Sequence, residues 1–344
     1  MPKQSKISNV SKAVTKYVPK TADINKVSAE ITHILDLEKV NLNVQIYIDE
    51  NASNETSTVV RNLFMTNAAN VRLQINYFDV IEDVSVNAKA DMAVIIGCDS
   101  STVLNLASKV RGMDVPCYIV FDSARTTSVS DFFANSEIAG DYFILNPEMI
   151  ESVNAMTKKL GTWIANVCVG KKFAFAAAFP FVARPLAMEI VHLTSIENVA
   201  IGVVPFISKA DFPLMLLNQI FMLGQIAAVY GHKIDVNLLK EACGVLAGAL
   251  VGRKAYRILH KALPIPRCIV AGTVAVGTTE AIGRALVAYF EAGGDIDGVL
   301  EIVKRTVMGS RVVSDAAKPV VDKVVSTVNA VNTVNTVKST PVNA

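Results

Sequence analysis

The fold is decided by residues 92–121, MAVIIGCDSSTVLNLASKVRGMDVPCYIVF. Two short apolar runs, Met92 to Ile96 and Cys117 to Phe121, enclose a helical stretch from Ser101 to Arg111. Asp91 before the first run and Pro116 before the second are ordinary residues at the entry to a strand. A strand, a helix and a strand in this order predict two parallel strands joined by a crossover helix.

The same alternation runs through residues 42–145. It predicts further strands at Leu42 to Ile48, Val71 to Phe78 and Tyr142 to Leu145, and further helices at Ser57 to Ala68 and Ser128 to Phe133. Short apolar strands that alternate with helices are typical of a Rossmann-like domain with a mainly parallel sheet.

Past residue 152 the strand pattern stops, and apolar helical stretches broken by prolines follow. We therefore predict an α/β plus all-α fold, in which a Rossmann-like parallel-sheet domain precedes an apolar helical bundle. A chain of 344 residues suffices for two domains with separate cores. The expected parts are basic amphipathic N-terminal helices (1–38), the Rossmann-like domain (39–151), the helical domain (152–313) and a Val/Asn/Thr-rich tail (314–344).

An excess of basic over acidic residues occurs at the start of the chain. A net charge of +2 indicates no general affinity for nucleic acid. The first twenty residues, however, carry several lysines and no acid, and Ile7, Val10 and Val14 lie on the opposite side of the predicted helix. This basic amphipathic helix either docks on its own domain or contacts anionic lipid or an acidic partner. We expect Asp23 to cap the helix that follows.

The cysteines and histidines indicate a reducing compartment and no metal site. Five widely spaced cysteines fit reduced, buried thiols better than a disulfide framework, and the four histidines lack metal-ligand spacing. Residues 1–22 lack the pattern of a secretory signal. These features predict a location on the cytoplasmic side of a membrane, peripheral or integral, with the cytoplasm as the alternative.

The loop after the first predicted strand bears on nucleotide binding. A GTPase needs glycines and a lysine there, because backbone amides and an ammonium group wrap the phosphates, and a Ser or Thr reaches magnesium. Residues 49–58, DENASNETST, contain neither glycine nor lysine and include three acids. Only Ser57 and Thr58 keep a trace of the pattern, and hydroxyls at a helix start are more often caps.

The later nucleotide motifs are also missing. The acid and glycine that hold magnesium would fall at Asp79, which no glycine follows, and the guanine-reading motif would fall at residues 121–124, FDSA. The layout is similar to a GTPase domain without its site residues, so we expect neither catalysis nor a cofactor. The rival hypothesis is a GTPase-like enzyme with an unorthodox phosphate loop. It needs a cation from elsewhere, and the candidates are Lys89, Lys109 and Arg125.

A second weak candidate site follows the strand at Met92 to Ile96, where open α/β sheets bind ligands. Asp99 and Ser100 could hold a polar group there, although the ordinary interpretation makes one of them the N-cap of the next helix. Cys98 has no histidine near it in sequence and is expected to be a packing residue.

Two stretches of the second half carry a resemblance to a known family. Asp211-Phe212-Pro213 opens an apolar run that ends at Tyr230-Gly231, and residues 283–293 read GRALVAYFEAG, with Pro264-Ile265-Pro266 between them. With these motifs, residues 171–300 resemble the bacterial domain-of-unknown-function 697 family. The resemblance implies a mostly helical domain, often fused behind a GTPase domain, in a family that includes inner-membrane proteins. It implies no reaction.

The run from Asp211 to His232 is uncharged between its ends and long enough to cross a bilayer. Because Asn218 and Gln219 would need partners in lipid, the centre of a soluble bundle is the alternative. Glycines at 244, 248 and 252 predict that another backbone approaches this face, in the same chain or in a homo-oligomer.

The sequence therefore predicts a non-catalytic protein of unknown pathway. We expect it to associate with a membrane or a protein partner through the basic N-terminal helix and the apolar helical domain. A soluble oligomeric scaffold is the third hypothesis.

Overall fold

The computed structural model describes residues 19–79, 84–123, 141–203, 211–252 and 267–308. The chain forms two compact units, one of residues His33–Leu186 and one that combines Met1–Thr32 with Ala187–Ala344. Three predictions lie outside the described residues: the basic amphipathic helix before residue 19, the helix from Ser128 to Phe133, and the C-terminal tail.

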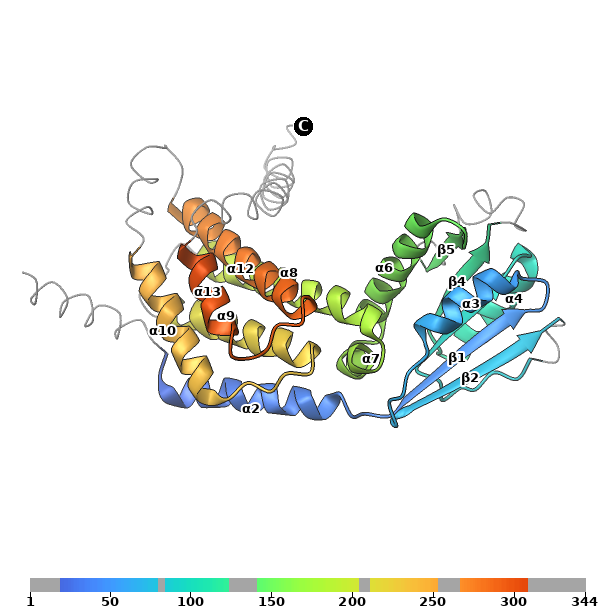
Figure 1. Ribbon diagram of the computed structural model, residues 1–344, viewed down its shortest axis with the longest axis horizontal. Helices are drawn as coiled ribbons and strands as arrows, with labels where there is room; N and C mark the ends of the chain where they lie inside the picture. Colours follow the sequence, from blue (N-terminus) through green and yellow to red (C-terminus); the bar gives the residue numbers. More distant parts are fainter. Residues whose placement is uncertain (1–18, 80–83, 124–140, 204–210, 253–266, 309–344) are drawn as a thin grey trace, which may run out of the picture. The chain divides into compact units, whose positions relative to one another are not determined.

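The first unit is built on a five-stranded sheet, in which every pair of neighbouring strands is parallel. The strands lie in the order β2-β1-β3-β4-β5 (Figure 1). This confirms the predicted Rossmann-like α/β domain. The strands are β1 (Leu42–Asp49), β2 (Val71–Phe78), β3 (Met92–Gly97), β4 (Cys117–Asp122) and β5 (Tyr142–Leu145).

Helices cover both faces of the sheet. Side chains alternate between the faces along each strand. On one face, residues such as Ile95 and Ile119 share a core cluster with Leu106 of α4 (Ser100–Arg111). On the other face, the ring of Tyr118 lies 5.3 Å from that of Trp163 in α6 (Ile150–Val167). The central strands are therefore buried on both sides, which explains their continuous apolar runs.

The helices after the sheet belong to the same unit. After α6 come a short 3-10 helix, η2 (Val169–Lys171), then α7 (Lys172–Ala178) and the start of α8 (Pro180–Val203). The ring of Phe64, at the end of α3 (Asn54–Leu63), lies 5.1 Å from Phe179 and 5.4 Å from Phe181. The unit thus ends at Leu186 rather than near Glu151. The strand pattern stops near Glu151, but the helical residues that follow still pack against the sheet unit.

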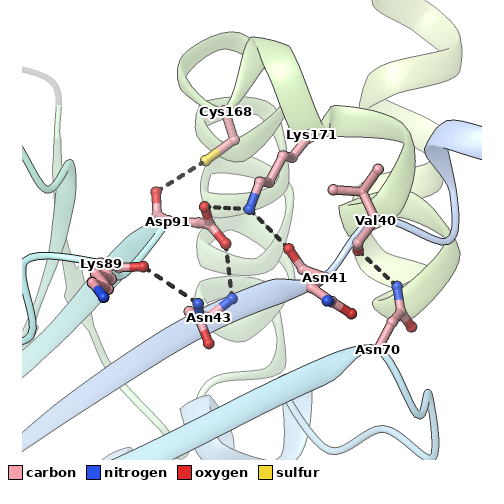
Figure 2. Close-up of polar contacts among 8 residues, drawn as sticks. All are labelled: Val40, Asn41, Asn43, Asn70, Lys89, Asp91, Cys168 and Lys171. Carbon is pink, nitrogen blue, oxygen red and sulfur yellow. Dashed lines mark hydrogen bonds and ion pairs between the residues drawn. The ribbon is translucent and has the colours of Figure 1, made fainter.

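A polar cluster fastens η2 to the amino ends of the strands (Figure 2). The Lys171 ammonium lies 2.7 Å from the Asp91 carboxylate and donates to the carbonyl of Asn41 at 2.8 Å. Asp91 in turn accepts the backbone N–H of Asn43 at 2.8 Å, and the Cys168 thiol donates to the Asp91 carbonyl. Asp91 therefore joins the starts of β1 and β3 to the helical segment after α6.

The second unit is helical in the part that the structure describes. Helix α2 begins at Thr21, so Asp23 lies in its first turn, where its charge favours the helix dipole, and the predicted cap at Asp23 was wrong. Helices α2 and α8 each contribute to both units. The unit contains parts of α2 (Thr21–Leu37) and α8, with α9 (Asp211–Val229), α10 (Val236–Gly252), α12 (Arg267–Glu291) and α13 (Val299–Met308).

The amides that interrupt the apolar run of α9 have partners on neighbouring helices. Asn218 donates to Asn198 of α8 at 3.3 Å, and Gln219 donates to the hydroxyl of Thr279 in α12 at 3.3 Å. Asn198 also donates to Thr279, at 3.0 Å. Among the described helices, none combines the length and the apolar character needed to cross a bilayer.

The glycine face of α10 is open at Gly244. A methyl group added there would meet no atom within 4 Å, so no backbone of the described chain approaches Gly244, and an approach by a second copy stays a prediction. A close approach occurs instead at Gly283 in α12, where an added methyl carbon would lie 2.4 Å from a methyl group of Val191.

Candidate functional site at the carboxyl ends of the strands

The candidate site lies where β1 and β3 are neighbours. The chain leaves β1 toward β2 on one side and later leaves β3 toward β4 on the other. In open parallel sheets, the carboxyl ends of two such strands form the crevice that binds ligands. Asp49 ends β1, Gly97 ends β3 and Asp122 ends β4.

Asp49 is buried, and its carboxylate is surrounded by donors. One oxygen accepts the backbone N–H of Asn51 at 2.9 Å and the side-chain amide of Asn51 at 3.1 Å. The other oxygen accepts the backbone N–H and the thiol of Cys98, both at 3.4 Å. With 3% of its surface exposed, Asp49 links the loops after β1 and β3.

Asp122 plays a similar part from the next strand. It is fully buried, and its carboxylate accepts the backbone N–H of Ser53 at 2.8 Å. Ser53 is the N-cap of α3, and its own hydroxyl accepts the N–H of Thr56 at 3.2 Å. N–H groups at a helix start are the donors that bind phosphate in other proteins. At the start of α3, the N–H of Ser53 binds a carboxylate of the protein and the N–H of Thr56 binds a hydroxyl.

Other backbone N–H groups of this loop also donate hydrogen bonds to acceptors within the protein. The N–H of Glu50 donates to the carbonyl of Phe78 at 3.0 Å, and that of Ala52 donates to the carbonyl of Asp49 at 2.9 Å. Together with the bonds made by Asn51 and Ser53, every backbone N–H from residue 50 to residue 53 has an acceptor within the protein. A phosphate could reach these amides only after those bonds break.

The predicted candidates Ser57 and Thr58 do not stand at the loop. Helix α3 begins at Asn54, so both residues lie inside the helix, and the N–H of Ser57 donates to the carbonyl of Ser53 at 3.1 Å. The prediction of a helix start at Ser57 was wrong because Ser53 caps the helix earlier. Ser57 is buried and Thr58 is exposed.

Asp99 caps α4, as the sequence predicted, and Ser100 is the first residue of that helix. The Asp99 carboxylate accepts the hydroxyl of Ser101 at 2.6 Å and the N–H of Thr102 at 2.8 Å. These bonds, led by the one from the Ser101 hydroxyl, lower the pKa of Asp99 below its ordinary value. Asp99 is exposed and ionised, and it adds a further negative charge beside the crevice.

The two described cations proposed for the rival enzyme, Lys89 and Lys109, have partners away from the loop. The carbonyl of Lys89 accepts from Asn43 near the start of β1, which places this residue at the opposite end of the sheet (Figure 2). Lys109 lies in the last turn of α4, and its ammonium donates to the carbonyl of Val84 at 2.7 Å. Arg125 lies outside the described residues.

The described cysteines are free thiols, as expected, and three of them are buried: Cys117, Cys168 and Cys243. Burial raises the pKa of the Cys168 thiol to about 12 and that of Cys243 to about 11. Thiols with a raised pKa are poor nucleophiles at neutral pH. No group of three or more metal-ligating side chains occurs among the described residues.

A shallow hollow of about 330 Å³ lies at the amino end of β4. Arg111 and Asp141 line it and pair with each other at 2.7 Å, so the hollow offers a neutralised charge pair to a ligand. The hollow is at the wrong end of the strands for the ligand site of an open sheet.

The helical unit contains one fully buried acid among its described residues, Glu280 of α12. Its carboxylate lies 2.7 Å from a ring nitrogen of His192 and 2.9 Å from Arg284. Burial alone would raise the pKa of Glu280, but the hydrogen bonds and charges of His192 and Arg284 together hold it below its ordinary value. This group joins α8 to α12, and the side chains of His192 and Arg284 are partly exposed.

Sequence reasoning missed Asp49, Ser53 and Asp122 as the residues that shape the site. A signal was present, because an acid that directly follows an apolar strand is costly to bury unless donors meet it. Which donors meet it could not be read from the sequence, since Ser53 and Asp122 are far apart along the chain. Compared with known proteins, the sequence matches no family model and no curated protein.

Proposed function

We propose that the sheet unit is a nucleotide-free domain with the layout of a GTPase, and that the chain is a non-catalytic interaction protein. The observation that carries the proposal is the bond from the Ser53 N–H to the buried Asp122 carboxylate. In this arrangement, a carboxylate of the protein takes the place of the anion at the start of α3.

Charge supports the same conclusion. Asp49 and Asp122 are buried beside the loop, and Glu50 and Asp99 lie close to them along the chain. A triphosphate would bring several negative charges to this group. At about 4 Å, each contact between like charges near a protein surface costs on the order of 4 kcal/mol. Without a lysine from the loop, nothing in the described site offsets that cost.

Titration calorimetry with magnesium GTP and magnesium ATP tests the proposal. We expect no heat of binding at nucleotide concentrations up to about 1 mM, which corresponds to a binding free energy weaker than about −4 kcal/mol. Micromolar binding would contradict the proposal. In that case, loss of binding in Ser57→Ala but not in the exposed variant Thr58→Ala would locate the site on α3.

We further propose that the helical unit carries the interaction, as the resemblance to the bacterial domain-of-unknown-function 697 family implies. The partner is a membrane surface at the cytoplasmic face or a protein, reached through the basic N-terminal segment and the apolar helices. The bonds of Asn218 and Gln219 within the bundle favour peripheral over integral attachment, because they give these amides partners without lipid.

Vesicle sedimentation distinguishes a membrane partner from a protein partner. We expect the full chain to bind vesicles that contain phosphatidylserine and to release them in high salt, since each lysine near an anionic surface contributes about 1 kcal/mol. Deletion of residues 1–20 should weaken this binding and leave the circular dichroism spectrum unchanged. A full chain that ignores acidic vesicles would contradict membrane attachment and leave the soluble scaffold as the better hypothesis.

A further inference from the structure

The outer edge of β2 is long and carries few protective features. Among the described strands, β2 ends the sheet on one side and pairs only with β1. Its eight residues, VRLQINYF, contain no proline, glycine or lysine. Natural proteins usually protect such an edge with charges, prolines or bulges, because its free N–H and C=O groups pair readily with another strand. Strand β5, at the other edge, has four residues.

The direction of the backbone groups on β2 follows from the contacts at its end. The carbonyl of Phe78 accepts from Glu50, so Phe78 faces β1. Because successive residues of a strand present their backbone groups to opposite sides, Leu73, Ile75 and Tyr77 present theirs to the open edge. The side chains there are accessible as well: Ile75 is 37% exposed and Tyr77 is 56% exposed.

The side chains of β2 are arranged symmetrically about Ile75. Leu73 and Tyr77 lie two residues before and after it, and the amides Gln74 and Asn76 lie one residue before and after it. In an antiparallel pair of identical strands centred on Ile75, Leu73 of one copy is opposite Tyr77 of the other, and Gln74 is opposite Asn76. These pairs place outward-facing residues opposite one another, as an antiparallel ladder requires.

Charge also favours this pairing. The one charged residue of the strand, Arg72, is near its start, and Asp79 directly follows its end. Both are exposed, and neither has an ion-pair partner in the described part of the chain. Antiparallel pairing brings each Arg72 to the end where the other copy carries Asp79. Parallel pairing would place Arg72 against Arg72.

We propose that two copies of this chain associate through β2, edge to edge and antiparallel, with the twofold axis at Ile75, to form one continuous sheet across the dimer. The apolar pairs, the amide pairs and the charges at the two ends are self-complementary, as a twofold interface requires. The proposal is independent of nucleotide binding, because the edge of β2 contains none of the residues of the carboxyl-end loops.

Sedimentation velocity of the full chain, from about 1 to 100 μM, tests the dimer. We expect the wild-type chain to be dimeric at the upper concentrations and Ile75→Pro to be monomeric. Proline removes one N–H that points outward, and it is tolerated at an edge strand whose N–H faces solvent. Should Ile75→Pro lose the native circular dichroism spectrum, Ile75→Lys provides the same test with a charge at the axis.

A charge exchange tests the antiparallel direction. In this register Arg72 lies near Asp79 of the other copy without being directly opposite it, so Arg72→Asp alone and Asp79→Arg alone should each raise the dissociation constant about two- to fivefold, and the double variant should reverse most of that rise. Ile144→Lys, on the β5 edge, is the matched control and should leave association unchanged. A wild-type chain that stays monomeric at about 100 μM would overturn the proposal, as would a dimer that survives both substitutions of Ile75.

Discussion

The two ends of the same parallel sheet bury acids in different ways. At the carboxyl ends, Asp122 is fully buried and is met by the backbone N–H of Ser53. At the amino ends, Asp91 is partly exposed and is met by the ammonium group of Lys171. The first acid joins the end of β4 to the loop before α3, and the second attaches a helical segment to the sheet. In both cases the carboxylate joins two segments of the chain, and the donor that it binds determines which segments these are.

The largest effect is expected where the acid is fully buried. Asp122→Ala removes a fully buried side chain and leaves the Ser53 N–H without this acceptor, which should lower the free energy of unfolding by about 2 to 3 kcal/mol. Urea unfolding measures the loss. The matched variant is Asp99→Ala, which removes an exposed cap of α4 and should cost about 1 kcal/mol. Equal losses in the two variants would show that burial at Asp122 contributes nothing.

A smaller effect is expected at the amino ends. A double-mutant cycle with Asp91→Asn and Lys171→Met should give a coupling energy of about 1 kcal/mol, because the pair is close but partly exposed to solvent. The exposed pair of Asp36 and Lys39, at 3.2 Å, is the control and should give less than about 0.5 kcal/mol. If both cycles give the same small value, the contact at Asp91 does not attach η2 measurably.

The smallest effect concerns Glu38, between α2 and β1. Burial raises its pKa from 4.5 to about 7, against a smaller opposing effect of Lys39, and one of its oxygens is buried without a hydrogen-bond partner. The folded protein therefore holds a proton that the unfolded chain has lost above pH 4.5, so stability should fall as the pH rises from about 4.5 to about 7.

Thermal unfolding across this pH range measures the contribution of Glu38. Because the residue is only half-buried, solvent screening should limit the change to below about 1 kcal/mol. Glu38→Gln should remove that part of the pH dependence, and Glu148→Gln, at an exposed position, should not. A profile that is the same in wild type and Glu38→Gln would contradict the raised pKa.

The strands were predictable because their signal is local. The bounds of β2 and β5 agree with the sequence prediction, and β1, β3 and β4 each extend one residue further. Burial on both faces makes the central strands continuously apolar, and such runs are visible in the sequence. The cap at Asp99 was predictable for the same reason, because it bonds to a residue three positions away.

The candidate site was predictable only as an absence of motifs. The loop of residues 49–58 lacks glycine and lysine, and this composition alone argues against a phosphate loop. The bond of Asp122 to the loop depends on Ser53, a residue that is far from Asp122 along the chain. The error at Ser57 has a related cause, since Ser53, Thr56, Ser57 and Thr58 are close together in the sequence and only the geometry of the cap selects Ser53.

By itself, the sequence determined the alternation of strands and helices, the absence of glycine and lysine from the loop of residues 49–58 and the change to helix after residue 152. Each of these depends on residues close together in the chain, where periodicity and capping act. The tertiary structure decided the strand order, the end of the first unit at Leu186 and the bonds of Asp49, Asp91 and Asp122. These features join distant residues, and packing and the need to satisfy buried charges select them only once the chain is folded.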